Sequence, residues 1–213
     1  MDAAITSTGG QAGTAPPCTV FVVDNDVRVR RAVDLLILSA GFTAESFSSL
    51  NNLLADHNRA KPGCLVIEFG LPNSGLEILD LLVERGVFLP VILLTQSVDV
   101  SLVTTAIRKG AFDVIIKPFP TELLGRRIRE AVERDVANRQ KRSQNVETQR
   151  RIERLTDRER DVMRLLASGD SAKQIGHKLS ISSKTVDNHR AKVLEKMGVD
   201  NPTQLALQLT LLD

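Results

Sequence analysis

The sequence predicts two folded parts, a doubly wound, five-stranded parallel α/β domain and a smaller all-α domain of four helices built around a helix-turn-helix. Two observations carry this prediction. Short apolar runs alternate with helical patterns up to about residue 119, which is typical of βα units joined in a parallel sheet. From residue 155 onward, short helical patterns are separated by glycine, serine and proline.

Four runs of three or four apolar residues, rich in valine and isoleucine, contain no polar interruption. Such runs indicate strands that are covered by helices on both faces of a sheet. A fifth, short candidate completes the sheet. In chain order the predicted strands are residues 20–23, 43–47, 65–67, 91–94 and 114–116.

Three segments between these strands have apolar residues three and four positions apart, the spacing of one face of a helix. They cover residues 27–40, 75–85 and 98–109. Strands that alternate with helices imply a doubly wound sheet, and such sheets place their functional sites at the carboxyl ends of the strands.

Polar side chains follow four of the predicted strands. Asp24 and Asn25 follow the first strand, Glu68 the third, Thr95 the fourth and Lys117 the fifth. The carboxyl ends of parallel strands meet at one edge of the sheet, so we expect these side chains to share one pocket. Glu68 either does chemistry in that pocket or replaces a residue that did.

A long, highly charged segment from residue 121 to residue 152 is predicted to be helical. Its first half carries an apolar stripe, which comprises Ile128, Ala131, Val132, Val136 and Ala137. We interpret the segment as the last helix of the α/β domain continuing into a solvated linker; a dimerising coiled coil is disfavoured because the stripe does not persist for three heptads. The expected parts are a disordered tail (1–17), the α/β domain (18–134), a helical linker (135–152) and the all-α domain (153–213).

The all-α domain contains a helix-turn-helix pattern. Residues 171–179 are predicted to form a support helix, residues 180–182 a tight turn, and residues 183–197 the second helix. Thr156 and Glu159 fit a capping box at the start of an earlier helix. The pattern as a whole indicates a domain that binds duplex DNA.

The second helix of this pattern has two distinct faces, and Ser182 or Ser183 is expected to cap its start. The face expected to pack inward comprises Val186, Val193, Leu194 and Met197. The opposite face is polar and suits a major groove, where lysine reaches guanine or phosphate, asparagine pairs with adenine, and groups at a helix start meet phosphate. The residues expected to contact DNA are Lys173, Ser183, Lys184, Thr185, Asn188, His189, Arg190 and Lys192.

Charge and composition agree with this division of roles. Residues 18–118 carry 9 basic and 11 acidic side chains, whereas residues 119–213 carry 19 and 14. The basic excess sits mainly in residues 119–154, so net charge alone does not establish DNA binding. The chain has no Tyr or Trp, and all seven Phe precede residue 120, which disfavours recognition of single strands by base stacking.

No run approaches the roughly 20 apolar residues of a membrane helix, and the start of the chain lacks the features of a signal peptide. We therefore expect a cytoplasmic protein with no membrane partner. Cys18 and Cys64 are too few for a disulfide framework and lack the spacing of zinc ligands. We expect both to be small buried apolar side chains, with a redox role as the alternative.

Residues 155–205 resemble the LuxR-type helix-turn-helix, and residues 19–134 resemble the flavodoxin-like receiver domain of response regulators of the FixJ and NarL type. The matching positions of the helix-turn-helix include Leu155, Thr156, Arg158, Glu159, Leu165, Gly169, Lys173, Ile175, Ile181, Ser182, Thr185, Val186, His189, Lys196 and Gly198. The resemblance implies a transcription regulator of the two-component type that binds paired half-sites on double-stranded DNA. It further implies a homodimer, formed through the receiver, the DNA-binding domain or both, in which the receiver controls dimerisation and release of the DNA-binding domain.

In the family that the chain resembles, a receiver uses an aspartate nucleophile, two earlier acids that hold Mg²⁺, and a hydroxyl and a lysine that grip the phosphoryl group. Asp24, Thr95 and Lys117 match this pattern. Asn25 stands at the position of the second acid, and Glu68 stands at the phosphoacceptor position. Glu68 extends its carboxylate by about 1.5 Å relative to aspartate, and Asn25 is a neutral, weaker ligand for a hard cation.

We therefore expect Mg²⁺ at Asp24 and Glu68 to bind weakly or not at all, and no other cofactor, unless Asp26 turns inward and substitutes for the missing acid. Two further departures from the family support this expectation. Val114 stands where the resemblance expects a switch aromatic, and the loop before Gly75 is one residue shorter than usual.

These changes predict a pseudo-receiver that is not phosphorylated and is held in one state by an ion pair between Glu68 and Lys117. The ion pair either imitates the phosphorylated form or is a structural relic. The alternatives are a conventionally phosphorylated regulator and a receiver that acts as a protein-interaction module. In the module, residues 100–116 would bind a regulatory protein or another copy and gate the DNA-binding domain. An enzyme is disfavoured because no histidine falls in the pocket segments to serve as a general base.

Overall fold

The computed structural model describes residues 18–56, 61–70 and 76–212. The tail expected at residues 1–17 and the loop at residues 71–75 lie outside the described residues. The chain divides into two compact units, Met1–Ala137 and Asn138–Asp213.

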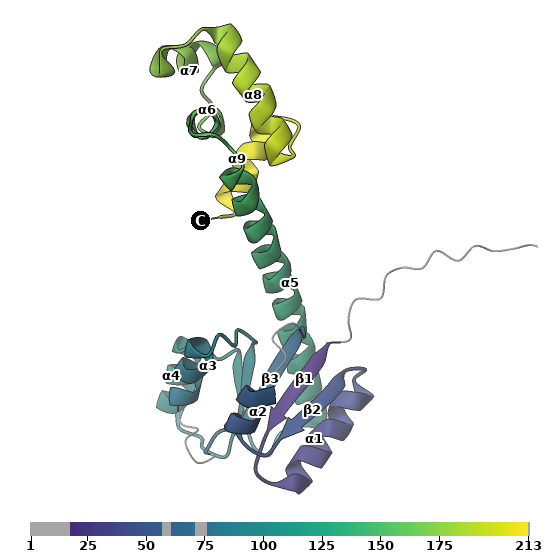
Figure 1. Ribbon diagram of the computed structural model, residues 1–213. Coiled ribbons are helices and arrows are strands. Elements are labelled where there is room, and N and C mark those ends of the chain that lie inside the picture. Colours follow the sequence, from purple (N-terminus) through teal and green to yellow (C-terminus); the bar gives the residue numbers. More distant parts are fainter. Residues whose placement is uncertain (1–17, 57–60, 71–75, 213) are drawn as a thin grey trace, which may run out of the picture. The chain divides into compact units, whose positions relative to one another are not determined.

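The first unit is built, among the residues described, on a five-stranded parallel sheet in the order β2-β1-β3-β4-β5 (Figure 1). All pairs of neighbouring strands run parallel, so the chain crosses over between every pair. The strands are β1 (Thr19–Val23), β2 (Thr43–Phe47), β3 (Gly63–Glu68), β4 (Val91–Thr95) and β5 (Asp113–Ile116). The predicted fold class is confirmed.

Helices cover both faces of this sheet, as the uninterrupted apolar runs require. One face packs against α1 (Val27–Ser39) and the first part of α5 (Thr121–Glu153). The other face packs against α2 (Leu50–Asp56), α3 (Glu77–Glu84) and α4 (Val100–Arg108). Every residue of β1 and β4 is buried because alternate side chains enter the two opposite cores.

Helix α2 is absent from the predicted elements. The segment has only seven residues and contains Asn51 and Asn52, which have low helix propensity. Leu53 is fully buried against the sheet, and Leu50 and Leu54 pack beside it. Tertiary packing therefore stabilises a helix that the local sequence specifies weakly.

The predicted apolar stripe on α5 is correct up to Val132 and wrong beyond it. Val136 is 44% exposed and Ala137 is exposed, whereas Asp135 is fully buried. The Oδ2 atom of Asp135 accepts a hydrogen bond from the backbone N–H of Gly63 at 2.9 Å. The start of β3 presents a buried donor here, and an apolar side chain would leave that donor without this bond.

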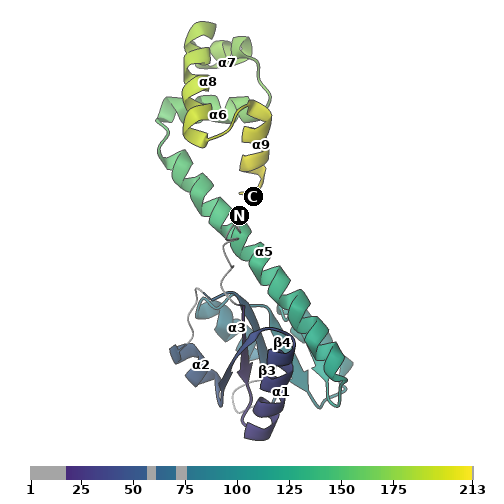
Figure 2. The ribbon, with the colours of Figure 1, turned by 90° about the vertical axis from the view of Figure 1, so that its right-hand side faces the viewer.

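The second unit contains the end of α5 and the four predicted helices of the all-α domain (Figure 2). These helices are α6 (Asp157–Ala167), α7 (Ala172–Leu179), α8 (Ser183–Met197) and α9 (Pro202–Thr210). Their shared core comprises Leu155, Val162, Met163, Leu166, Ile175, Val186, Val193, Met197 and Leu205.

The structure bears on two further expectations, the polarity of the helices and the burial of the cysteines. Every helix within the described residues is too short or too polar to span a lipid bilayer. Cys64 is fully buried as expected, whereas Cys18 is only half-buried, and neither forms a disulfide. Burial raises the pKa of the Cys64 thiol, which keeps it protonated and unreactive.

Candidate functional site

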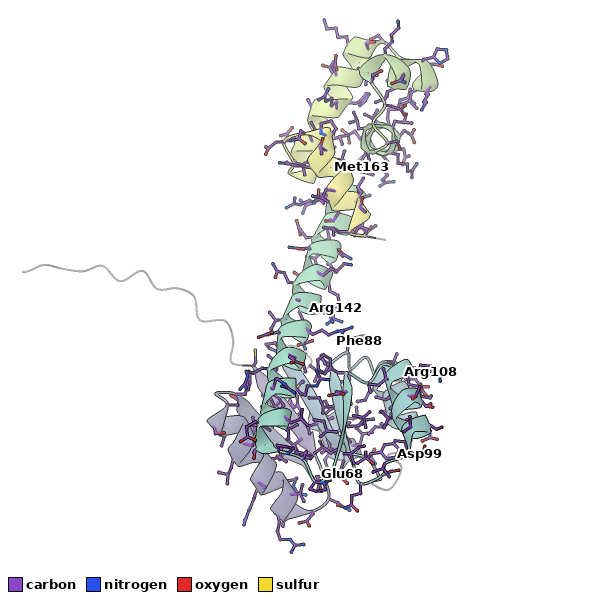
Figure 3. All side chains as sticks on the ribbon, turned by 180° about the vertical axis from the view of Figure 1, so that it is seen from behind. Glu68, Phe88, Asp99, Arg108, Arg142 and Met163 are labelled. Atoms are coloured by element: carbon purple, nitrogen blue, oxygen red, sulfur yellow. The ribbon has the colours of Figure 1, made fainter. Side chains whose placement is uncertain are left out.

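The ends of four strands bring the predicted pocket residues to one edge of the sheet. Asp24 directly follows β1, Glu68 ends β3, Thr95 ends β4, and Lys117 directly follows β5. Figure 3 labels Glu68 at this edge, where Asp99 also lies, and Phe88 at the opposite edge. Parallel topology therefore gathers residues that are far apart in sequence.

Lys117 is the centre of charge in this pocket. Its Nζ atom donates a hydrogen bond to Oε2 of Glu68, with which it forms an ion pair. The same Nζ lies 3.8 Å from Oδ2 of Asp24. The three side chains are largely shielded from solvent, since 21% of Lys117, 15% of Glu68 and 4% of Asp24 is exposed. One ammonium group thus faces two carboxylates.

Asp26 does not replace the missing acid in this structure. It caps the start of α1, where its carboxylate accepts hydrogen bonds from the backbone N–H and the guanidinium of Arg28. These bonds, with the side-chain bond the largest contribution, hold the pKa of Asp26 below its usual range. Asn25 is exposed, and its neighbour Asp26 does not supply a carboxylate to the pocket because that carboxylate is bound to Arg28.

The other polar groups of the pocket are also engaged. Asp24 Oδ1 accepts a hydrogen bond from the backbone N–H of Asp26 at 2.8 Å, and its carbonyl accepts one from Arg30 Nη1 at 2.6 Å. The Thr95 hydroxyl accepts a bond from the Ser97 N–H at 3.0 Å. A cavity of about 370 Å³ opens beside these groups. Its lining comprises Asn25, Glu68, Phe69, Gly70, Thr95, Gln96 and Ser97.

These residues do not fit a divalent cation well. Mg²⁺ binds carboxylate oxygens, which must not already be paired with a cationic side chain. Glu68 is paired with Lys117, one oxygen of Asp24 accepts a backbone N–H, and Asp26 is bound to Arg28. Among the described residues, no group of three or more His, Cys, Asp or Glu side chains could hold a metal ion.

The helix-turn-helix is built by side-chain caps. Ser171 and Gln174 form a capping box at the start of α7. Ser180 ends that helix in the left-handed conformation, at φ 54°, and the chain then turns into α8. Ser182, rather than Ser183, caps α8 by accepting the N–H of Thr185 at 3.1 Å. The predicted bounds of both helices are thus explained by local chemistry.

Helix α8 has the two faces that the sequence predicts. Val186, Val193 and Met197 are fully buried, and Leu194 is partly buried in the same core. Of the residues expected to contact DNA, Thr185 and His189 are half-buried. The others are exposed, namely Lys173, Ser183, Lys184, Asn188, Arg190 and Lys192.

The two half-buried residues have different surroundings. The Thr185 hydroxyl lies 2.8 Å from the Ser182 hydroxyl, so it belongs to the cap of the helix. The Nδ1 atom of His189 is enclosed and has no hydrogen-bond partner within the described part of the chain. Asp187, which is not among the residues expected to contact DNA, is exposed beside Asn188 on the same polar face.

An ion pair with a buried carboxylate connects α6 to α8. Glu159 forms the predicted capping box with Thr156 and accepts a hydrogen bond from Lys196 Nζ at 2.6 Å. Only 4% of Glu159 is exposed. The bond from Lys196, followed by that from the Thr156 backbone, lowers the pKa of Glu159 to about 2. This acid is therefore ionised throughout the neutral range.

Comparison with known proteins supports both units. Residues 20–129 match the response regulator receiver domain, and residues 153–209 match the bacterial regulatory proteins of the luxR family. Transcriptional regulatory protein TdiR of Thauera aromatica is 32% identical over 90% of this chain and 85% of its own length. Transcriptional regulatory protein FixJ of Azorhizobium caulinodans is 34% identical over 84% and 85%.

Solved structures agree with these relatives. Response regulator StyR has a TM-score of 0.78 at 30% identity, with 92% of this chain and 99% of that chain covered. Full-length FixJ from B. japonicum has a TM-score of 0.56 at 28% identity, with 92% and 97% covered.

A parallel α/β unit with acids and a lysine at one edge, followed by a helix-turn-helix, defines a two-domain transcription regulator. The chain belongs to the response regulators of two-component systems that join a receiver domain to a LuxR-type DNA-binding domain.

Proposed function

We propose that this response regulator controls transcription without phosphoryl transfer to its receiver domain. The observation that carries the proposal is the ion pair between Glu68 and Lys117. This pair occupies the lysine that the family resemblance assigns to the phosphoryl group. The same ammonium group also lies 3.8 Å from Asp24. A phosphoryl oxygen could therefore bind Lys117 only by displacing the carboxylate of Glu68.

The chemistry of the pocket supports the same proposal. A carboxylate paired with an ammonium group is a weak nucleophile, and an in-line displacement tolerates misplacement of its reacting atom poorly. Phosphoryl transfer also needs cationic groups that neutralise the developing charge. Asn25 is neutral and would hold a metal cation only weakly. The ammonium group of Lys117 is already bound to Glu68.

Incubation of the purified protein with acetyl phosphate and Mg²⁺, followed by intact-mass measurement, tests this proposal. We expect no gain in mass, while a response regulator with the full set of acids serves as the positive control. A stoichiometric gain of one phosphoryl group, on Glu68 or a neighbouring residue, would sink the proposal. It would establish the alternative, a conventionally phosphorylated regulator.

We further propose that the ion pair imitates the phosphorylated form and holds the receiver in its active state. A negative group bonded to Lys117 at the end of β3 resembles a phosphoryl group in charge and position. The test compares operator binding by the full chain with binding by residues 138–213, the second compact unit. Much tighter binding by that fragment would mean that the receiver inhibits, which contradicts an active lock.

The second unit is proposed to read duplex DNA through α8. Support comes from the division of that helix into a buried apolar face and an exposed face with Lys184, Asn188 and Lys192. Selection of duplexes from a random pool by the full-length protein tests this role. An enriched, two-fold symmetric sequence is expected, whereas a pool without enrichment would contradict sequence-specific binding.

The receiver also has a surface suited to a protein partner. Four apolar side chains of the α4 and β5 region are exposed on the first unit, namely Val98, Val100, Ile107 and Ile116. Exposed apolar side chains that gather on one surface are typical of protein interfaces. We propose that this surface binds a second copy of the chain, which would pair two DNA-binding domains on two half-sites.

A further inference from the structure

The C-terminal end of the proposed DNA-reading helix is held by a side chain of α5. Helix α8 ends at Met197, and Gly198 follows in the left-handed conformation at φ 65°. The Nη1 atom of Arg151, in the last turn of α5, donates a hydrogen bond to the Met197 carbonyl at 2.7 Å. A guanidinium group at this position satisfies a carbonyl that the helix leaves free, and it opposes the negative end of the helix dipole.

The position of the Arg151 guanidinium depends on a hydrogen bond and on the space beside it. Its Nε atom donates to Oε1 of Glu147, one turn earlier in α5, at 3.0 Å. Gly198 leaves room for the guanidinium, because a Cβ atom at that residue would lie only 2.6 Å from Arg151 Nη1. Gly198 is thus needed for its backbone conformation and also for the space it leaves.

The same part of α5 contacts the last helix of the unit. The Oγ1 atom of Thr148 accepts a hydrogen bond from Nε2 of Gln208, in α9, at 3.2 Å. Thr148 is only 5% exposed, and Ile152 packs against the core shared by α6 to α9. Most of residues 138–153 are exposed, but Thr148, Arg151 and Ile152 contact helices of the DNA-binding unit.

We propose that Arg151 is a positioning residue for DNA recognition, which sets the orientation of α8 from its C-terminal end. This inference rests on the proposed reading of DNA by α8. Asn188 lies nine residues before Met197, or about 13 Å along the helix axis. A small tilt of α8 about its held end therefore moves the Asn188 amide, and bidentate contacts to a base tolerate such movement poorly.

A positioning role for Arg151 would affect sequence-specific DNA binding more than non-specific DNA binding. Contacts to phosphate are made with any sequence, so they survive a small reorientation of α8. Contacts to base edges do not survive it. Loss of Arg151 is expected to lower affinity for the preferred sequence far more than affinity for other duplexes, which a mere loss of folded protein would not do.

The test uses full-length protein and two duplexes, one recovered from a random pool by the unsubstituted protein and one scrambled version of it. For Arg151→Ala we expect roughly a tenfold loss of affinity for the recovered duplex, with little change for the scrambled duplex. Arg150→Ala is the matched control. Arg150 is the exposed neighbour and makes no hydrogen bond or ion pair among the described residues, so the variant loses the same charge without the contact.

Two more variants keep the test decisive where Arg151→Ala does not fold. Arg151→Lys retains one donor for the Met197 carbonyl and is expected to restore part of the discrimination. Gly198→Asn suits the left-handed backbone, but its Cβ atom displaces the guanidinium and is expected to reproduce the loss. The losses in Gly198→Asn and Arg151→Ala should not add in the double variant, because both remove one contact.

The outcomes are distinct. Equal losses on both duplexes, additive losses in the double variant, or unchanged discrimination in all variants would overturn the positioning role. If the unsubstituted protein does not distinguish the two duplexes, the proposed reading of DNA fails instead. Circular dichroism of each variant at the binding temperature establishes the folded fraction.

Discussion

At the residue scale, the chemistry of the receiver pocket depends on Glu68 and Asn25. The side chain of Glu68 is one methylene longer than that of aspartate, and its carboxylate forms an ion pair with Lys117. The ammonium group of the pocket is therefore already neutralised. Asn25 supplies an oxygen without charge. Under the proposed function, each of these two residues alone would weaken a phosphoryl-transfer site, and together they would remove both the free acceptor and the second anionic ligand.

The double variant Asn25→Asp with Glu68→Asp is expected to regain phosphoryl uptake from acetyl phosphate and Mg²⁺. Aspartate at position 68 draws back from Lys117, and aspartate at position 25 returns the missing charge. Intact-mass measurement reads the result, with each single variant as a control that remains largely unlabelled. An unlabelled double variant would place the defect elsewhere in the pocket.

Asn188 tests the reading of bases. Asn188→Ala should relax sequence preference at one base position and cost about 1 to 3 kcal/mol there, because a bidentate contact to adenine is lost. Lys192→Ala should instead weaken binding to all sequences and lower the salt slope by about 1. Repeating the pool selection with each variant separates the two effects. An unchanged preference in Asn188→Ala would refute the assignment.

Glu159 links stability of the second unit to pH. Its pKa in the folded protein is about 2, below the ordinary 4.5, because Lys196 and the Thr156 backbone donate to the carboxylate. The ionised acid therefore stabilises the fold above about pH 4.5, and that contribution is lost as the pH falls from 4.5 toward 2.

Glu159→Gln should lower the free energy of unfolding by about 1 to 3 kcal/mol near neutral pH and remove this part of the pH dependence. Denaturant unfolding near neutral pH and near pH 3 measures both effects. The control is Glu195→Gln, at an exposed position of α8. The same acid sensitivity in Glu159→Gln as in the unsubstituted protein would assign that sensitivity to other groups.

At the element scale, α5 serves both compact units. In the first unit its buried residues cover the sheet, and Asp135 accepts the hydrogen bond of the Gly63 amide. In the second unit its last turns hold α8 through Arg151 and α9 through Thr148. Polar contacts anchor the helix where its apolar stripe has ended.

Asp135→Ala should destabilise the first unit by about 1 to 3 kcal/mol, because it leaves a buried backbone donor without its acceptor. Val136→Ala changes a neighbouring side chain that is 44% exposed, and it should have little effect. Denaturant unfolding of both variants measures the difference. Equal stability of the two variants would show that the buried bond is of little consequence.

At the scale of the whole molecule, the proposed dimer can be tested at the exposed apolar surface of α4 and β5. Val100→Glu, at a side chain that is 76% exposed on α4, should abolish dimerisation and weaken operator binding, since one DNA-binding domain alone engages one half-site. Light scattering without a phosphodonor measures the oligomeric state. Val83→Glu, at a 59% exposed position of α3, is the control that should leave the dimer intact. A Val100→Glu protein that still dimerises would move the interface elsewhere.

Sequence reasoning reached the sheet, its strand ends and the helix-turn-helix because these depend on local periodicity and on caps such as Ser171 and Ser182. It missed α2, whose residues become helical by packing against the sheet. It also placed Val136 in the apolar stripe where Asp135 is buried. The acid is buried because it accepts a hydrogen bond from the backbone N–H of Gly63, which is 72 residues away in the sequence.

By itself, the sequence determined the order of the elements, the set of polar groups at the strand ends and the resemblance to response regulators. Only the tertiary structure decided that Asp135 accepts a hydrogen bond from Gly63 and that Arg151 holds the end of α8. These partners are 72 and 46 residues apart. Their contact depends on chain crossovers and packing, which no local pattern encodes, whereas a helix or a strand end is encoded within a few residues.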